Sequence, residues 1–253
     1  MRLRLDKIHL LLLLSVVLGV FYVLNIFALN RISARLVSTP AELSFVIIAP
    51  GPDQCERCFN VAKIIERVSS APDVKILDKQ TITPVNPVFG DLVERHNIRN
   101  LPALIISGDV SDERLAGAWS SLGGAVKDGN VIIQDLPPYY DLAQQRPKGI
   151  VEAILLKDKT CENCFSESRY LDIVRRSGMV LGNSVVYDIS SAAGEALAAE
   201  YQVRKLPALL LSPEAEVYPW FLSVWQKVGS REVDGWFVFR RVGQLGQYKE
   251  IKN

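Results

Sequence analysis

Two cysteine pairs with the same Cys-x-x-Cys spacing constrain this sequence more than any other feature. The first pair is Cys55 and Cys58, the second is Cys161 and Cys164, and together they contain every cysteine of the chain. Each pair follows a short apolar run and leads into a segment with helical spacing of apolar residues. On the first turn of a helix, free backbone N–H groups and the positive dipole end favour a thiolate on the first cysteine, and the second can close a short disulfide. The pattern therefore favours a reversible dithiol switch.

Three other uses of these cysteines remain open at this point. A zinc site built from two such pairs has about 15 to 20 residues between them, whereas 102 residues intervene here and the two histidines are His9 and His96. We therefore expect no metal site. Permanent structural disulfides are a stronger alternative, because small extracytoplasmic domains are often held together in this way. Buried, inert cysteines fit least, because both motifs lie among polar residues.

A run of 22 residues without a charge, residues 8–29, predicts an N-terminal membrane anchor. As a helix it would be about 33 Å long, enough for one crossing. The run is longer than the core of a cleavable signal peptide, so we expect an uncleaved transmembrane anchor, with a removed signal as the alternative. The basic residues around it favour a cytoplasmic N-terminus at residues 1–7. This single-pass membrane localisation would place the C-terminal domains, and all the cysteines, in an extracytoplasmic, oxidising compartment.

Length and composition predict a folded protein with room for about two domains. The chain has 253 residues, of which 49% are hydrophobic, and its net charge is +1. Acidic and basic residues are scattered without long blocks of one sign. We therefore expect ordinary solvated surface and no nucleic-acid partner.

The two halves of the chain repeat one order of expected elements. In each half a strand precedes the cysteine pair, a helix carries it, and a second strand and helix lead to a proline that opens the next strand, Pro102 or Pro207. Residues 98–104 match residues 203–209 at five of seven positions. Solenoid repeats are about 20 to 50 residues long, so a repeat of about a hundred residues indicates two copies of one domain. The expected strands are 45–49, 74–77, 104–106, 131–133, 150–156, 184–189 and 236–242. The helix that carries the first cysteine pair is expected to end near Val68, and the helices expected after it are 91–96, 115–122, 161–177, 194–201 and 220–228.

This order resembles the thioredoxin fold, present twice over roughly residues 43–253. The tandem arrangement is similar to the two-domain protein disulfide oxidoreductases and the disulfide isomerases. The resemblance implies an α/β fold class, with two tandem thioredoxin-like domains, each a mixed central sheet with flanking helices, after one N-terminal transmembrane helix. The expected divisions are a linker at 30–41, the first domain at 42–136, a connector at 137–148 and the second domain at 149–253.

The resemblance also implies a role for each motif residue. They are the attacking cysteines Cys55 and Cys161, the resolving cysteines Cys58 and Cys164, the cis-prolines Pro102 and Pro207, and Leu101 and Leu206, whose backbone would pair with substrate.

The sequence departs from the family pattern near these motifs. Segments that look helical, 115–122 and 220–228, are inserted after the strands that the prolines open, and the tryptophan often found before the cysteine pair is missing. Ala49 or Leu155 stands where thioredoxins keep a buried acid, so proton transfer would need another group or water. Lys157 and Lys159 could support a thiolate on Cys161 electrostatically, or could be solvated loop residues.

The sequence thus predicts a membrane-anchored extracytoplasmic thiol–disulfide oxidoreductase that acts through a mixed disulfide and needs no bound cofactor. Its expected partners are protein thiols or disulfides and an unidentified redox donor. The alternative is a non-catalytic thioredoxin-like binding scaffold with structural disulfides. Glu56 and Glu162 place negative charge beside the attacking cysteines, and Arg57 offsets only the first. A reductase or isomerase is therefore favoured over a dedicated oxidase.

Overall fold

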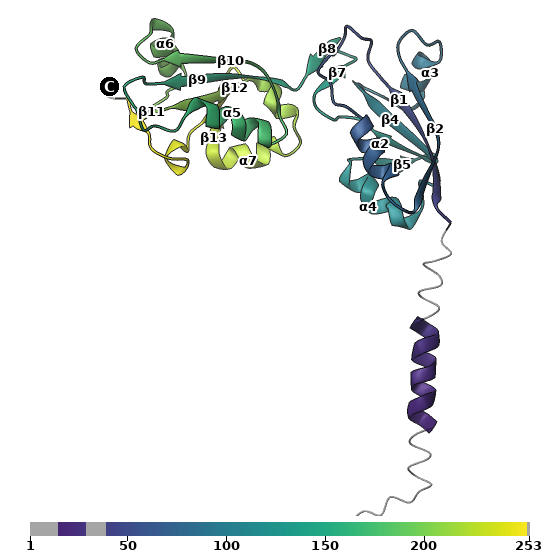
Figure 1. Ribbon diagram of the computed structural model, residues 1–253. Coiled ribbons are helices and arrows are strands. Elements are labelled where there is room, and N and C mark those ends of the chain that lie inside the picture. Colours follow the sequence, from purple (N-terminus) through teal and green to yellow (C-terminus); the bar gives the residue numbers. More distant parts are fainter. Residues whose placement is uncertain (1–14, 29–38, 252–253) are drawn as a thin grey trace, which may run out of the picture.

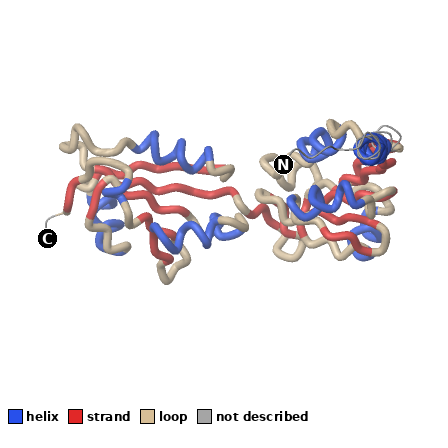
Figure 2. The backbone as a smooth tube through the Cα atoms, turned by 90° about the horizontal axis from the view of Figure 1, so that it is seen from below, coloured by secondary structure: helices blue, strands red, loops and turns tan. Residues whose placement is uncertain are grey.

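The computed structural model describes residues 15–28 and 39–251. Two mixed α/β units lie side by side and are joined through β8 (Arg146–Lys148) and β9 (Ile150–Lys157) (Figure 1). Each unit contains a five-stranded sheet, ordered β2-β1-β4-β6-β5 in the first and β10-β9-β12-β14-β13 in the second. Figure 2 shows helices on both faces of each sheet. The shared strand order confirms the internal repeat.

The first sheet is mixed, with one parallel and three antiparallel strand pairs. Strand β1 pairs in parallel with β2 and antiparallel with β4, and β6 pairs antiparallel with β4 and β5. A parallel pair needs a crossover, and α2 supplies it. The bounds are β1 (Ala41–Ile48), α2 (Ala62–Ser69), β2 (Val74–Ile82), α3 (Phe89–Arg95), β4 (Ala103–Gly108), α4 (Glu113–Ser121), β5 (Ala125–Lys127) and β6 (Asn130–Ile133).

Alternation along β1 divides the first core into two layers. Leu43 and Phe45 pack with α2 and with Trp119 of α4 on one face. Ile48 packs with Ile105 and with α3 on the other face. Side chains of a strand alternate between the two faces of its sheet, so one apolar strand supplies both layers. The helix expected at 115–122 is confirmed, and it covers the same face as the helix after the cysteines.

The second unit repeats this arrangement. Helices α5 and α7 cover one face of its sheet, and α6 covers the other. The aromatic side chains around Phe221 belong to the core, with ring centroids of Phe221 and Trp225 5.0 Å apart. The bounds are α5 (Glu167–Arg176), β10 (Val180–Asp188), α6 (Ala192–Glu200), β12 (Ala208–Leu211), a 3-10 helix (Pro213–Val217), α7 (Phe221–Val228), β13 (Gly229–Arg231), β14 (Phe237–Phe239) and a 3-10 helix (Val242–Gln244).

Short strands beside each main sheet were not expected from the sequence. Strand β3 (Asn100–Leu101) pairs with β7 (Tyr139–Asp141), which pairs with β8. Strand β11 (Lys205–Leu206) pairs with β15 (Lys249–Glu250). The segment expected to be a connector, 137–148, therefore contains a β-hairpin that pairs with the first unit.

The structure contradicts the expected membrane anchor at 8–29. Within this run, residues 15–28 are described, and they are helical. The rest of the run, the expected cytoplasmic residues 1–7 and most of the linker lie outside the described residues. Across the part of the chain that is described, none of the helices combines the length and apolar character needed to cross a membrane. The single-pass localisation inferred from the apolar run was therefore wrong.

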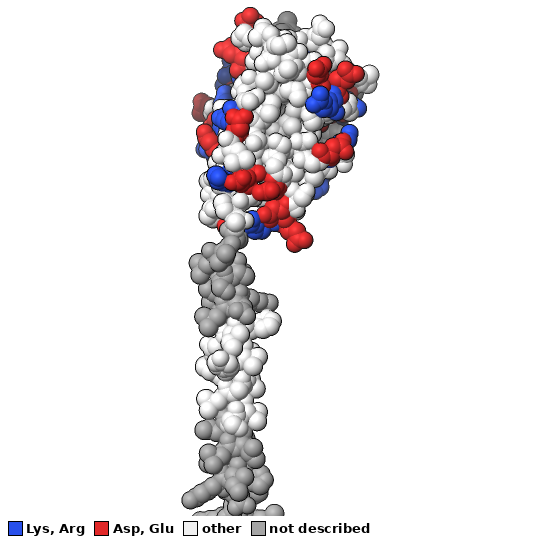
Figure 3. Space-filling view, turned by 90° about the vertical axis from the view of Figure 1, so that its right-hand side faces the viewer, with Lys and Arg blue, Asp and Glu red and all other residues white. Residues whose placement is uncertain are grey.

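Charges of both signs intermingle on the surface of the first unit. Figure 3 shows acidic and basic side chains interspersed with neutral ones over one face, as the scattered charges of the sequence predict.

Candidate functional site

All four cysteines are joined in disulfides within their own motifs. The Cα–Cα distances are 5.4 Å for Cys55–Cys58 and 5.5 Å for Cys161–Cys164, and all four side chains are partly exposed. Both pairs lie in turns that precede α2 and α5, and not on the first turn of either helix. The turn that holds the first cysteine pair has its own hydrogen bond, because the Cys58 N–H donates to the Cys55 carbonyl at 3.4 Å. The free N–H groups at the helix starts therefore do not belong to the cysteine loops.

The peptide bonds before both motif prolines are cis, as predicted for Leu101–Pro102 and Leu206–Pro207. The carbonyl oxygen of each leucine lies against the second cysteine of its pair. Cys58 Sγ is 3.5 Å from the Leu101 oxygen, and Cys164 Sγ is 3.7 Å from the Leu206 oxygen. A disulfide sulfur has no proton to donate, so these are contacts in the oxidised state. After reduction, each thiol could donate to its carbonyl.

The leucines that were expected to pair with substrate pair with this chain's own strands. Leu101 pairs antiparallel with Tyr140, and Leu206 pairs antiparallel with Lys249. Sequence reasoning missed both pairings, because strands of two or three residues are too short to show an alternating pattern.

A pocket of about 240 Å³ opens onto the second disulfide. It is lined by Lys157, Asp158, Lys159, Cys161, Glu162, Cys164, Phe165, Ser166, Glu167 and Pro207. Lys157 Nζ lies 3.1 Å from a carboxylate oxygen of Glu167, and the Lys159 backbone N–H donates to Asp188 Oδ2 at 2.9 Å. The positive charge of Lys157 is therefore paired with the Glu167 carboxylate at the wall of the pocket.

Asp158 anchors the loop before Cys161. Its carboxylate accepts hydrogen bonds from the Thr160 backbone N–H at 2.8 Å and hydroxyl at 2.6 Å, and it lies 2.5 Å from Lys249 Nζ. The hydrogen bond from Lys249, followed by those from Thr160, lowers the pKa of Asp158 to about 2. The group is therefore a carboxylate at any ordinary pH.

The first disulfide lies against the core and beside the second unit. Cys55 and Cys58 pack on the layer that contains Ile48. The Arg57 guanidinium donates to the backbone carbonyl of Leu181, 124 residues away in β10. The sequence suggested that Arg57 balances Glu56, and the structure instead gives its guanidinium a partner in the other unit.

Tyr170 is a contributor to the site that the sequence did not reveal. It is buried in α5, and its hydroxyl donates to the carbonyl of Pro207 at 3.1 Å. Burial raises the pKa of Tyr170 well above its usual value, so the hydroxyl keeps its proton. This hydrogen bond fixes the proline loop beneath the second disulfide. No sequence motif marks the residue, because it reads as one more apolar position of an amphipathic helix.

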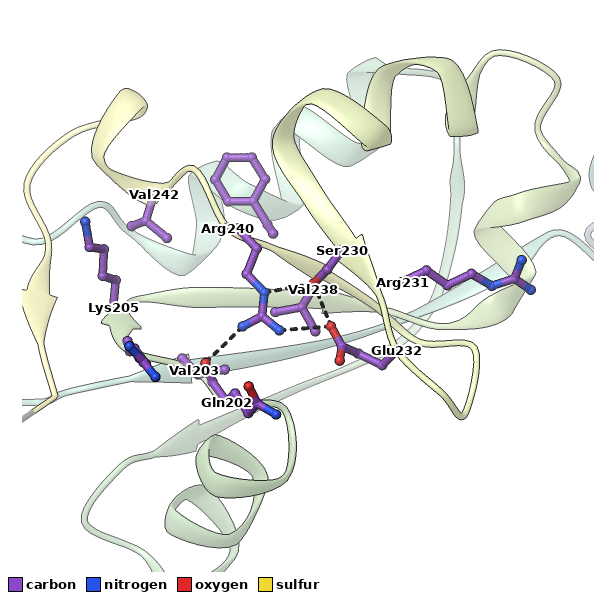
Figure 4. A pocket seen from close by; sticks show the side chains of 11 residues that line it. Gln202, Val203, Lys205, Ser230, Arg231, Glu232, Val238, Arg240 and Val242 are labelled. Atoms are coloured by element: carbon purple, nitrogen blue, oxygen red, sulfur yellow. Dashed lines mark hydrogen bonds and ion pairs between the residues drawn. The ribbon is translucent and has the colours of Figure 1, made fainter. Parts of the chain in front are cut away.

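A larger hollow, of about 460 Å³, lies in the second unit around Arg240 (Figure 4). The Arg240 guanidinium donates to Ser230 Oγ at 2.8 Å, to the carbonyls of Gln202 at 3.1 Å and Tyr201 at 2.8 Å, and to Glu232 at 2.9 Å. Four of its five N–H donors are thus used within the fold. Arg240 therefore ties the β13–β14 hairpin to the end of α6 and leaves little donor capacity for a ligand.

No protein-family model and no curated protein matches the sequence. Among solved structures, the chain is similar to the NTD_N/C domain of alkylhydroperoxide reductase AhpF from Enterococcus faecalis (V583). That match has 12% sequence identity and a TM-score of 0.21, and it covers 72% of this chain and 87% of the other.

Proposed function

We propose that this protein is a thiol–disulfide oxidoreductase that acts by dithiol–disulfide exchange at two Cys-x-x-Cys pairs, with reduction or isomerisation favoured over oxidation. One observation carries the proposal. Two units of the same topology each hold a partly exposed disulfide at the same place, against the carbonyl that precedes a proline. We assign these units to domains at about 42–136 and 149–253.

The contacts of the second cysteines support the division of roles. In the reduced protein the Cys164 thiol would donate a hydrogen bond to the Leu206 carbonyl, which favours its protonated form. Cys161 has no such acceptor among the described contacts, so it would ionise first and attack. The same argument assigns attack to Cys55 and resolution to Cys58, whose sulfur faces the Leu101 carbonyl.

The exchange moves two electrons between the protein and its substrate. The Cys161 thiolate attacks a substrate disulfide, a mixed disulfide forms, and one substrate sulfur leaves as a thiolate. The Cys164 thiolate then attacks Cys161 Sγ, which closes the protein disulfide and releases the second substrate thiol. The substrate is reduced and the protein oxidised, so turnover requires a dithiol donor that reduces the Cys161–Cys164 bond again.

The surroundings of the cysteines favour a reducing or isomerising direction. Strong oxidants in this kind of exchange are those whose reduced, thiolate form is stabilised. Here the cysteines precede the helices, Lys157 is paired with Glu167, and Lys249 is paired with Asp158. Glu162 is exposed between the two cysteines. Positive charge near Cys161 is therefore largely balanced, and the thiolate gains little from it.

Redox titration of the full-length protein tests the proposal. We expect both pairs to equilibrate with a dithiol buffer at potentials between about −300 and about −120 mV. We also expect little thiolate absorbance from the reduced protein at pH 5. Potentials below about −300 mV would support the alternative of a binding scaffold with permanent disulfides. A potential near −120 mV would show that the protein is an oxidant and that the charge argument is wrong.

A further inference from the structure

The C-terminal tail, residues 247–251, occupies a backbone edge beside the second disulfide. Strand β15 pairs antiparallel with β11, with Leu206 opposite Lys249, and the Ile251 N–H donates to the Arg204 carbonyl at 2.9 Å. Hydrogen-bonded pairs recur at every second residue of an antiparallel ladder, so Leu206 and Lys249 form the next such pair. The peptide groups of Leu206 are therefore satisfied by the tail.

The tail is attached on both sides of the cysteine loop. The N–H of Phe165, the residue after Cys164, donates to the Gln247 carbonyl at 3.0 Å. On the other side, Lys249 Nζ lies 2.5 Å from Asp158 and 2.7 Å from Thr160 Oγ1, just before Cys161. The Asp158 side chain is only 12% exposed, whereas that of Lys249 is 47% exposed. The tail thus crosses the loop as a surface strand, with one cation directed at a recessed carboxylate.

The first unit has the same backbone contacts. The Phe59 N–H donates to the Pro138 carbonyl at 2.7 Å, and the Leu142 N–H donates to the Arg99 carbonyl at 3.0 Å. There the occupying strand, β7, is held firmly, because Tyr140 is buried and belongs to the core layer beneath it. It also continues into β8 within the chain.

The two occupying strands differ in what holds them. In β7 and β8, Asp141 and Lys148 form an ion pair of 2.9 Å with side chains 15% and 18% exposed. Both residues of β15 are exposed, and only Ile251 of the tail packs against the core of the second unit. A two-residue strand with this little burial can leave its edge at small cost, whereas β7 cannot leave without uncovering Tyr140.

We infer that the C-terminal tail is a displaceable internal occupant of a peptide-binding edge on β11, and that its competitor is an extended polypeptide segment with Lys or Arg opposite Leu206. A backbone edge that accepts a strand from its own chain accepts one from another chain by the same hydrogen bonds. Asp158 selects the cationic side chain. The role of this peptide binding rests on the proposed function, because the incoming segment would carry the disulfide that Cys161 attacks.

Peptide binding in the absence of thiol chemistry tests the inference. A shortened protein, truncated after Gly246, is prepared, and its affinity is measured for a synthetic peptide with the sequence of residues 247–253. A matched peptide carries Lys249→Glu. We expect the shortened protein to bind the first peptide and to bind the second about fivefold more weakly, the upper end of what the loss of one surface ion pair predicts. Full-length protein should bind the first peptide at least tenfold more weakly, because its tethered tail is present at about millimolar effective concentration.

A point variant in the intact chain covers the case in which the shortened protein does not fold. Lys249→Glu should speed amide hydrogen exchange of Phe165, whose N–H the tail protects, by about fivefold. Lys227→Glu, the same charge change on α7, should leave that rate unchanged. Equal affinity for the two peptides, or unchanged exchange in Lys249→Glu, would overturn the inference. Because neither readout involves sulfur chemistry, a failed redox titration and a failed tail test remain distinguishable.

Discussion

Two carbonyl oxygens distinguish the cysteines within each pair. The sequence predicted that a helix start would activate the first cysteine, whereas the structure places the pairs before the helices, with Cys58 Sγ near the Leu101 oxygen and Cys164 Sγ near the Leu206 oxygen. An acceptor beside one thiol favours its protonated form and leaves the other to ionise first.

Serine substitution tests this division of roles. With Cys164→Ser, Cys161 can attack a substrate disulfide but nothing resolves the mixed disulfide. We therefore expect covalent protein–substrate complexes that are seen on non-reducing gels and are lost on reduction. Cys161→Ser is the matched control and should trap far less, because the remaining thiol is the one beside the carbonyl. Equal trapping by the two variants would contradict the assignment. Cys58→Ser and Cys55→Ser apply the same test to the first pair.

Helices α6 and α4 each contain a glycine, but the space around the two glycines differs. Gly194 lies in the first turn of α6, where an added Cβ would come within 2.1 Å of the Asp188 backbone oxygen at the end of β10. Gly117 lies in α4, where an added Cβ would meet nothing within 4 Å. The same substitution therefore acts in opposite directions in these two helices.

We expect Gly194→Ala to destabilise the protein by about 1–3 kcal/mol, because the helix must shift away from β10. Gly117→Ala should stabilise it by about 0.4–1 kcal/mol by reducing the freedom of the unfolded chain. Denaturant unfolding of the two variants measures both effects. A stabilising Gly194→Ala would mean that α6 does not pack against Asp188 as described. The effect also bears on the site, because Asp188 holds the Lys159 backbone next to the second disulfide.

At the scale of the whole molecule, several contacts fix the junction between the two units. Tyr218 donates to the Gly149 carbonyl at 2.7 Å, and Glu214 accepts from the Gly149 N–H at 2.8 Å and from Arg146 at 2.7 Å. Arg57 adds a contact from the first cysteine motif to Leu181 in the second unit. The orientation of the units is thus linked directly to the first disulfide loop.

Removal of the Arg57 guanidinium should loosen this junction. We expect Arg57→Ala to broaden the distribution of distances between spin labels on the two units, because the hydrogen bond to the Leu181 carbonyl is lost. Arg95→Ala, on α3 of the first unit, is the control and should leave the distribution unchanged. Each unit should keep its own secondary structure in both variants. An unchanged distribution in Arg57→Ala would show that the contacts at Gly149 hold the units alone.

Much of the fold followed from local patterns in the sequence. Apolar runs and helical spacing predicted the main strands and helices, and the repeated proline-led strands indicated two similar units. Cysteines with two residues between them can form a disulfide with little help from the rest of the chain, so the pairing within Cys55–Cys58 and Cys161–Cys164 is also local. The inserted helices α4 and α7 could also be predicted from the sequence, because their apolar residues have helical spacing.

Tertiary structure decided the features that connect distant residues. The contact of Arg57 with Leu181 joins residues 124 apart, and that of Lys249 with Thr160 joins residues 89 apart. Periodicity carries information only about neighbours within a few residues, and a strand as short as β15 has no period to detect. The sequence therefore determined which residues could carry the chemistry, and the packing of distant segments determined what stands next to them.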